Sequence, residues 1–215
     1  IGADTAYGAQ GRQADFVEEE YKGRGDFSCA YVFCVNTRRV VAELHGRIAP
    51  DAFAKQLNWL GHFYGSNDHG VVFPATLAVE RNHESGVTVI KKLQQEYQYL
   101  ALYQSRSVAV KKRNRPTIRT GWVTSVMTRG PMLDELAESI AAHRYPDDEL
   151  LTAKAIHIPS VECLNELLSF IIVYDERGQA KRAEAQDGAH DDRVLALAIT
   201  LQASQSISTA PSENE

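Results

Sequence analysis

Strand-like apolar runs alternate with amphipathic helical stripes along this chain, which limits it to folds that pack helices against a sheet. β-Branched and aromatic residues fill 27–35 and 39–45, and the turn residues between these runs predict a hairpin. From Pro50 onward, apolar side chains recur at helical spacing on one face; they are Phe53, Leu57, Leu60 and Tyr64. A short strand is also expected at 1–6, with Asp4 inside it.

The second half continues the same alternation. A strand at 76–79 and a helix over 84–97 form a β-α-β stretch with the strand-like residues 100–103. The sequence further predicts a hairpin at about 104–120, a helix from Pro131 to about His143, a strand at 168–174 that pairs with 179–185, and a last helix from Asp191 or Asp192. These elements predict an α/β fold with a central mixed β-sheet and helices on both faces.

The chain length of 215 residues favours one domain, which we expect to span 1–203 and to include the hairpin insertion. The polar tail 204–215 is expected to be disordered. The first residue is Ile1 and no secretory signal precedes the first strand, so we expect a piece of a longer protein. No apolar run has the length of a membrane span, and the dipeptide Gly-Lys of a nucleotide-binding P-loop never occurs. The three cysteines do not have zinc-site spacing, so free thiols are expected.

The formal net charge of −5 conceals a basic stretch. Residues 97–133 carry seven positive charges and no acid, so the rest of the chain has a net charge of −12. Such a stretch can bind a polyanion even in an acidic protein. We expect DNA phosphates to contact the basic residues of the hairpin, namely Lys111, Lys112, Arg113, Arg115 and Arg119. A solvated basic hairpin with no partner is the alternative.

Carboxylates stand at the ends of three apolar elements. Asp4 lies in the first strand, Glu80 follows the strand at 76–79, and Asp191 and Asp192 begin the last helix. Each has an ordinary explanation when taken alone, such as helix capping by Asp191 or Asp192. If the three element ends converge, however, the like charges repel one another unless cations neutralise them. Oxygen ligands of this kind suit Mg²⁺ or Mn²⁺.

Four segments in the same order resemble the C-terminal nuclease domain of phage terminase large subunits. They are Ile1-Gly-Ala-Asp-Thr-Ala-Tyr-Gly, Val79-Glu80-Arg81-Asn82 with Gly86, Gly121-Trp122 with Thr128-Arg129, and Gly188-Ala189-His190-Asp191-Asp192-Arg193-Val194 with the small-residue helix after it. The resemblance implies an RNase H-like fold and a metal-dependent endonuclease that cuts concatemeric viral DNA during genome packaging.

The resemblance also implies residue roles. Asp4 matches the aspartate that bridges two divalent cations, Glu80 matches the second acidic position, and Asp191 or Asp192 matches the last ligand. His190 is expected to be structural or to support the ligands. Two Mg²⁺ or Mn²⁺ ions would activate a water and stabilise the leaving oxygen. The implied partners are double-stranded DNA, the terminase ATPase domain, the small terminase subunit and the portal, in the cytoplasm of an infected bacterium and without a membrane.

Two alternatives remain open at this point. Another RNase H-like nuclease, such as a Holliday junction resolvase or a transposase core, would share the acidic residues but select different DNA. A non-catalytic DNA-gripping module would use the basic stretch and would show no metal requirement.

Overall fold

The computed structural model describes residues 1–6, 27–68, 71–107, 117–174, 180–185 and 190–207. Its centre is a four-stranded mixed sheet with the strand order β3-β2-β1-β6. The strands are β1 (Gly2–Asp4), β2 (Ser28–Cys34), β3 (Arg39–Gly46) and β6 (Ala78–Val79). β1 runs antiparallel to β2 and parallel to β6. The predicted α/β class and mixed sheet are therefore confirmed, and so is the hairpin of β2 and β3.

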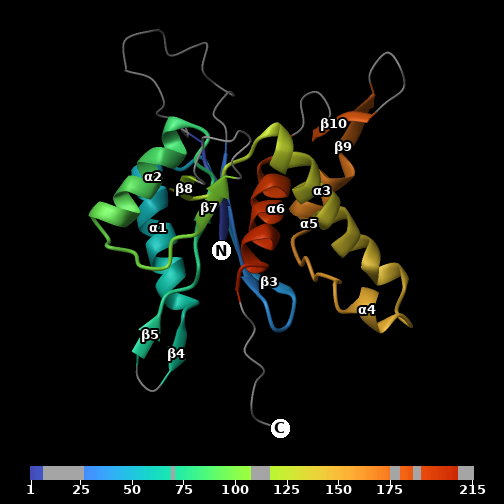
Figure 1. The fold of residues 1–215 in the computed structure, drawn as a ribbon, viewed down its shortest axis with the longest axis horizontal. Helices are drawn as coiled ribbons and strands as arrows, with labels where there is room; N and C mark the ends of the chain where they lie inside the picture. The colour runs from blue at the N-terminus through green and yellow to red at the C-terminus, as the bar shows by residue number, and fades with distance from the viewer. Residues whose placement is uncertain (7–26, 69–70, 108–116, 175–179, 186–189, 208–215) are drawn as a thin grey trace.

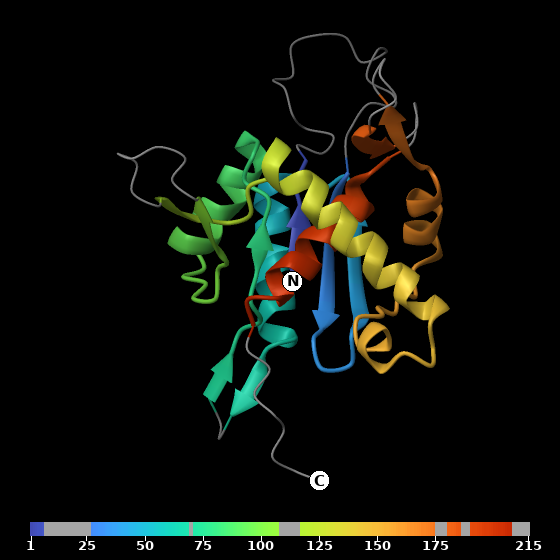
Figure 2. The same ribbon diagram turned by 45° about the vertical axis from the view of Figure 1, so that its right-hand side comes forward.

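Helices cover both faces of this sheet, as predicted (Figure 1). One face packs against α1 (Pro50–Phe63) and α2 (Glu84–Gln95), and the other packs against α3 (Val126–Ala141), α5 (Val161–Leu168) and α6 (Asp192–Ser204). Figure 2 shows α6 and α3 crossing one side of the sheet with α1 on the other side. Because side chains alternate along a strand, Ala30 and Val32 of β2 join the α1–α2 core, whereas Cys29 and Tyr31 join the α6 core.

Helix α6 is the most buried helix of the described fold. Ten of its side chains are buried, and large apolar ones such as Leu197 and Ile199 each contribute about 1.5–3 kcal/mol to stability. Its close approach to the sheet depends on Gly2 of β1, where an added Cβ would overlap the backbone of Thr200. The helix therefore lies directly over the strand that carries Asp4.

Smaller hairpins and helices surround the sheet. β7 (Gln104–Ser107) pairs with β8 (Thr117–Thr120), and β9 (Phe170–Tyr174) pairs with β10 (Ala180–Ala185), so both predicted hairpins form where the structure describes them. The sequence did not predict the short hairpin of β4 (Ser66–Asp68) and β5 (Val71–Phe73). The single-turn helices η2 (Ala142–Arg144) and α4 (Glu149–Thr152) follow α3.

Several predicted boundaries need correction. Helix α3 begins at Val126, five residues before the predicted start at Pro131, because Ser125 and Thr128 form a capping box. The predicted strand at 100–103 is reduced to a bridge between Leu102 and Leu77. The turn at 175–178 and the tail beyond residue 207 lie outside the described residues. No helix of the described residues is long and apolar enough to cross a membrane. All three cysteines are free, although Cys34 is only partly buried.

Candidate functional site

Asp4 and Glu80 lie side by side at the ends of two parallel strands. Gly2 pairs with Ala78 and Ala3 pairs with Val79, so the next residues along the two strands are Asp4 and Glu80. Ala3 and Val79 point into the α1–α2 core, and alternation therefore directs Asp4 and Glu80 to the α6 face. Both residues are buried, with 8% and 6% of their surface exposed.

The first turn of α6 brings two more carboxylates to the same face. Asp191 is the N-cap residue and Asp192 is the first helical residue, yet Asp191 makes no side-chain capping hydrogen bond. Instead, Glu166 of α5 accepts a hydrogen bond of 3.0 Å from the backbone N–H of Arg193. The ordinary capping explanation therefore does not describe Asp191.

The buried carboxyl group of Asp4 has acidic surroundings. Burial raises the pKa of Asp4 well above its usual value, and the charge of Glu80 and a hydrogen bond between the two carboxyl groups raise it further. The charges of Asp192 and Asp191 also raise the pKa of Asp4. Buried carboxylates with like-charged neighbours are unfavourable when ionised, so an isolated site of this kind retains a proton or attracts a cation.

The donor chemistry of these residues fits a hard divalent cation. All four side chains offer only carboxylate oxygens, which Mg²⁺ and Mn²⁺ prefer over the nitrogen and sulfur ligands of zinc sites. Within the described ranges, no three His, Cys, Asp or Glu side chains already form a metal-binding group. The fit thus rests on the donor type and on the mutual repulsion around Asp4.

Two nitrogen-bearing side chains, those of Arg129 and His190, contact the aspartates at the start of α6. The guanidinium of Arg129 in α3 lies 3.2 Å from Asp191 Oδ2. The ring of His190 is 55% exposed, and its Nδ1 lies 3.6 Å from Asp192 Oδ2. Both contacts are made at the edge of the carboxylate cluster.

The first turn of α2 packs tightly behind Glu80. An added Cβ at Gly86 would overlap the Glu80 carbonyl oxygen, so only glycine permits this approach. Ser85 donates a hydrogen bond to the Thr5 carbonyl at 3.2 Å and thereby joins the same turn to the residue after Asp4. These contacts connect α2 to both strand ends.

The base of the β7–β8 hairpin adjoins Glu80. Glu80 forms a parallel bridge with Trp122, and Arg81 donates a hydrogen bond of 2.9 Å to the carbonyl oxygen of Thr120 at the end of β8. Arg119 is exposed on β8. The other residues predicted to bind DNA lie outside the described residues; they are Lys111, Lys112, Arg113 and Arg115. The structure places the hairpin base, but not these side chains, beside the carboxylates.

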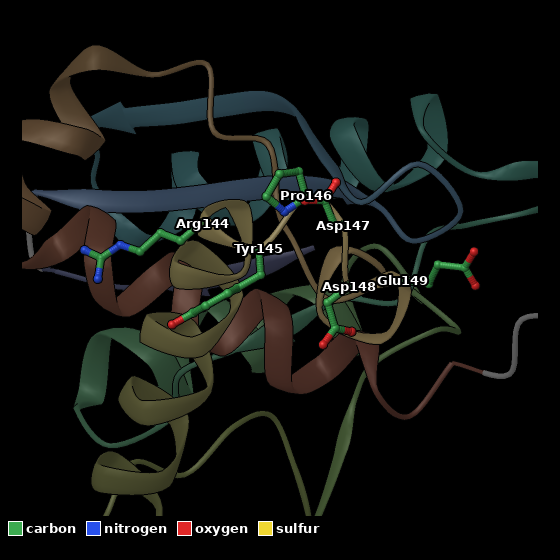
Figure 3. A pocket seen from close by; sticks show the side chains of 6 residues that line it. All are labelled: Arg144, Tyr145, Pro146, Asp147, Asp148 and Glu149. Atoms are coloured by element: carbon green, nitrogen blue, oxygen red, sulfur yellow. The ribbon is translucent and has the colours of Figure 1, made fainter.

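A surface hollow between η2 and α4, of about 510 Å³, is separate from this cluster (Figure 3). Its lining includes Asp147, Asp148 and Glu149. Asp148 caps α4 by accepting hydrogen bonds from two backbone N–H groups. The acidic lining would repel a polyanion, and we assign it no role.

Sequence reasoning did not identify Glu43 and Glu166, which bind Arg193. Glu43 Oε1 lies 2.6 Å from Arg193 Nε, and Glu166 Oε1 lies 2.5 Å from a terminal nitrogen of the same guanidinium. The one local signal was the acid at position 43, which follows three consecutive apolar residues of the strand, Val40, Val41 and Ala42.

The fold defined by this sheet, its two helical layers and the carboxylate edge is RNase H-like, and it is the fold of phage large terminase nucleases. The chain is similar to the large terminase nuclease from the thermophilic phage G20c, with a TM-score of 0.51 and 15% identity over 94% of this chain and 80% of that chain. The same nuclease with bound magnesium gives a TM-score of 0.52 and 16% identity over 89% of this chain and 78% of that chain. No family model and no curated protein matches the sequence.

Proposed function

We propose that this chain is a metal-dependent DNA endonuclease, the nuclease module of a terminase large subunit that cuts concatemeric viral DNA during packaging. The observation that carries the proposal is the pairing of β1 with β6, which brings the buried residues Asp4 and Glu80 side by side at the ends of two strands. Asp191 and Asp192 at the start of α6 would complete the site. The fold and the magnesium bound by a similar nuclease support the same reaction class.

In this proposal Asp4 would be a ligand of the cations, since it is buried beside Glu80 at the ends of two paired strands. Glu80, Asp191 and Asp192 would hold the cations together with Asp4. Two Mg²⁺ or Mn²⁺ ions would supply Lewis-acid activation of water and neutralise charge at the scissile phosphate. The rigid contacts of Gly86 and Ser85 fix the strand ends, so the carboxylates need little reorganisation when charge develops on the phosphate.

The DNA-binding part of the proposal places the β7–β8 hairpin along the phosphate backbone. Its base is joined to the Glu80 strand through Arg81, and Arg119 is exposed beside it. The other proposed phosphate contacts are Lys111, Lys112, Arg113 and Arg115. Such contacts give salt-sensitive binding without base specificity. The remaining partners would be an ATPase domain, a small terminase subunit and a portal, in the host cytoplasm.

Plasmid cleavage by the purified chain tests the proposal. Nicking and linearisation with Mg²⁺ or Mn²⁺, absent in EDTA and absent in folded D4N and D191N/D192N variants, are the expected results. Asp147→Asn, in the acidic turn outside the cluster, is the matched control and should cut normally. Metal-independent binding without cleavage would instead favour a DNA-gripping module. Preferential cutting of four-way junctions over linear duplex would favour a resolvase.

A further inference from the structure

Arg193, the residue that follows Asp191 and Asp192, contacts three polar side chains through its guanidinium. The Arg193 guanidinium lies 2.6 Å from Glu43, 2.5 Å from Glu166 and 3.0 Å from His45 Nδ1. Its side chain is only 15% exposed. Hydrogen bonds and the charges of Glu43 and Glu166 raise the pKa of Arg193 despite its burial.

These partners come from two elements that flank the start of α6. Glu43 and His45 are opposite Tyr31 and Cys29 in the β2–β3 ladder, and those β2 residues face the α6 core. Glu43 and His45 therefore present their side chains to α6 from the sheet. Glu166 approaches from α5, so the guanidinium connects the sheet, α5 and α6 at one point.

Glu166 makes a second contact that bears directly on the aspartates. Its Oε2 accepts the backbone N–H of Arg193, an N-terminal N–H that has no partner inside the helix. A helix ordinarily satisfies such a group with the side chain of its own N-cap residue. Here Glu166 supplies that acceptor, and the Asp191 carboxylate is turned to Arg129 at the edge of the cluster.

A forked guanidinium with three fixed acceptors restricts both the position and the rotation of the first turn of α6. The directions of the Asp191 and Asp192 side chains follow from that turn. A lysine retains the charge but offers one compact ammonium in place of the planar fork, so it cannot reproduce the contacts to Glu43, Glu166 and His45 together.

We propose that Arg193 is a positioning residue, held by Glu43, Glu166 and His45, which sets the geometry of the α6 aspartates for divalent-cation binding. This inference rests on the proposed function, since it assigns Arg193 a role at the same site. Arg193 does not contact the cation or the DNA in this proposal, and it acts through the orientation of its helix turn.

The test compares Arg193→Lys with Arg38→Lys as a matched control. Arg38 is also partly buried and donates hydrogen bonds to the carbonyl oxygens of Ala155 and Lys154. It lies in the turn between β2 and β3, whereas Asp4 pairs with Cys29 near the opposite end of β2. Calorimetry measures the affinity for Mn²⁺, and plasmid cleavage measures the activity. Hydrogen exchange of the backbone amides measures how firmly the first turn of α6 is held.

Arg193→Lys should weaken Mn²⁺ binding by about 10–100-fold, the usual effect of losing a residue that orients metal ligands. Amide exchange should accelerate in the first turn of α6 but not in its last turn, and Arg38→Lys should leave Mn²⁺ affinity unchanged. If Arg193→Lys does not fold, Glu166→Gln, which retains the side-chain volume, is judged by the same criteria. If the wild-type chain binds Mn²⁺ and a folded variant binds it with the same affinity, the positioning role of Arg193 is overturned, and the proposed function is not. A wild-type chain that binds no Mn²⁺ would overturn the proposed function and this inference together.

Discussion

Replacing Asp4 with asparagine should stabilise the metal-free protein while abolishing cleavage. Asp4 and Glu80 sit on neighbouring parallel strands, which are about 4.8 Å apart. Two unit charges at that separation repel by about 3 kcal/mol at an effective dielectric constant of about 20. Because a shared proton relieves part of this repulsion, we expect Asp4→Asn to increase the free energy of unfolding by about 1–3 kcal/mol at pH 8.

The sign of the pH dependence follows from the raised pKa of Asp4. A carboxyl group whose pKa is higher in the folded state is not penalised below its unfolded pKa, and it destabilises the fold progressively as the pH rises toward the folded pKa. The difference between wild type and Asp4→Asn should therefore be small at pH 4 and largest at pH 8.

Urea unfolding in EDTA, followed by circular dichroism at both pH values, measures this difference. Mg²⁺ at about 1,000 times its Kd should reverse the order, since it stabilises the wild type by about 4.1 kcal/mol and the variant much less. Asp147→Asn makes the same chemical change in the exposed turn before α4 and should leave stability unchanged at either pH. An Asp4→Asn variant less stable than wild type at pH 8 in EDTA would refute the reasoning about crowded carboxylates.

Three other measurements test separate parts of the structure. Gly86→Ala should lower the free energy of unfolding in urea by about 1–3 kcal/mol through overpacking, because an added Cβ would overlap the Glu80 carbonyl oxygen; an unchanged free energy would contradict the packing at Gly86. Burial opposes ionisation of Glu43, but hydrogen bonds, including one from Arg193, lower its pKa overall. The ionised Glu43 therefore stabilises the folded state above about pH 4.5, and this stabilisation is lost at lower pH. Glu43→Gln should therefore flatten the acid-unfolding curve, and an unchanged curve would contradict the ion pair. Arg119→Ala should weaken DNA binding and reduce the slope of log K against log salt by about 0.9, and an unchanged slope would remove Arg119 from the interface.

The sequence predicted the elements better than their lateral arrangement. Alternating residues in 27–35 and 39–45 encode a hairpin locally, and β2 and β3 form it. The parallel pairing of β1 with β6 has no local signal, although it alone makes Asp4 and Glu80 neighbours. From the sequence, convergence of the carboxylates could be predicted only if the element ends meet. The pairing register brings Asp4 and Glu80 together, and the participation of Asp191 and Asp192 stays a prediction.

Two other features, the start of α3 and the capping of α6, were not predicted because they also lack a local sequence signal. The early start of helix α3 was not predicted because its first residues are exposed, Val126 at 97% and Met127 at 83%, and belong to no apolar stripe. Glu166 caps α6 from 27 residues away, which no local capping pattern can indicate. Lys111 and its basic neighbours in 108–116 lie outside the described residues, so their contact with DNA stays a prediction.

The placement of the site has a consequence during protein synthesis. Asp4 is in the first strand, but Asp191 and Asp192 stand at the start of the last helix, which packs closely against Gly2 of that strand. At about 5–20 residues per second, a ribosome needs on the order of ten seconds after Glu80 to synthesise the rest of the fold. Throughout that interval the nascent chain contains Asp4 and Glu80 but not yet Asp191 and Asp192, and α6 does not yet cover the sheet. The proposed nuclease therefore gains its cutting activity only when the final helix docks, after nearly the whole domain has left the ribosome.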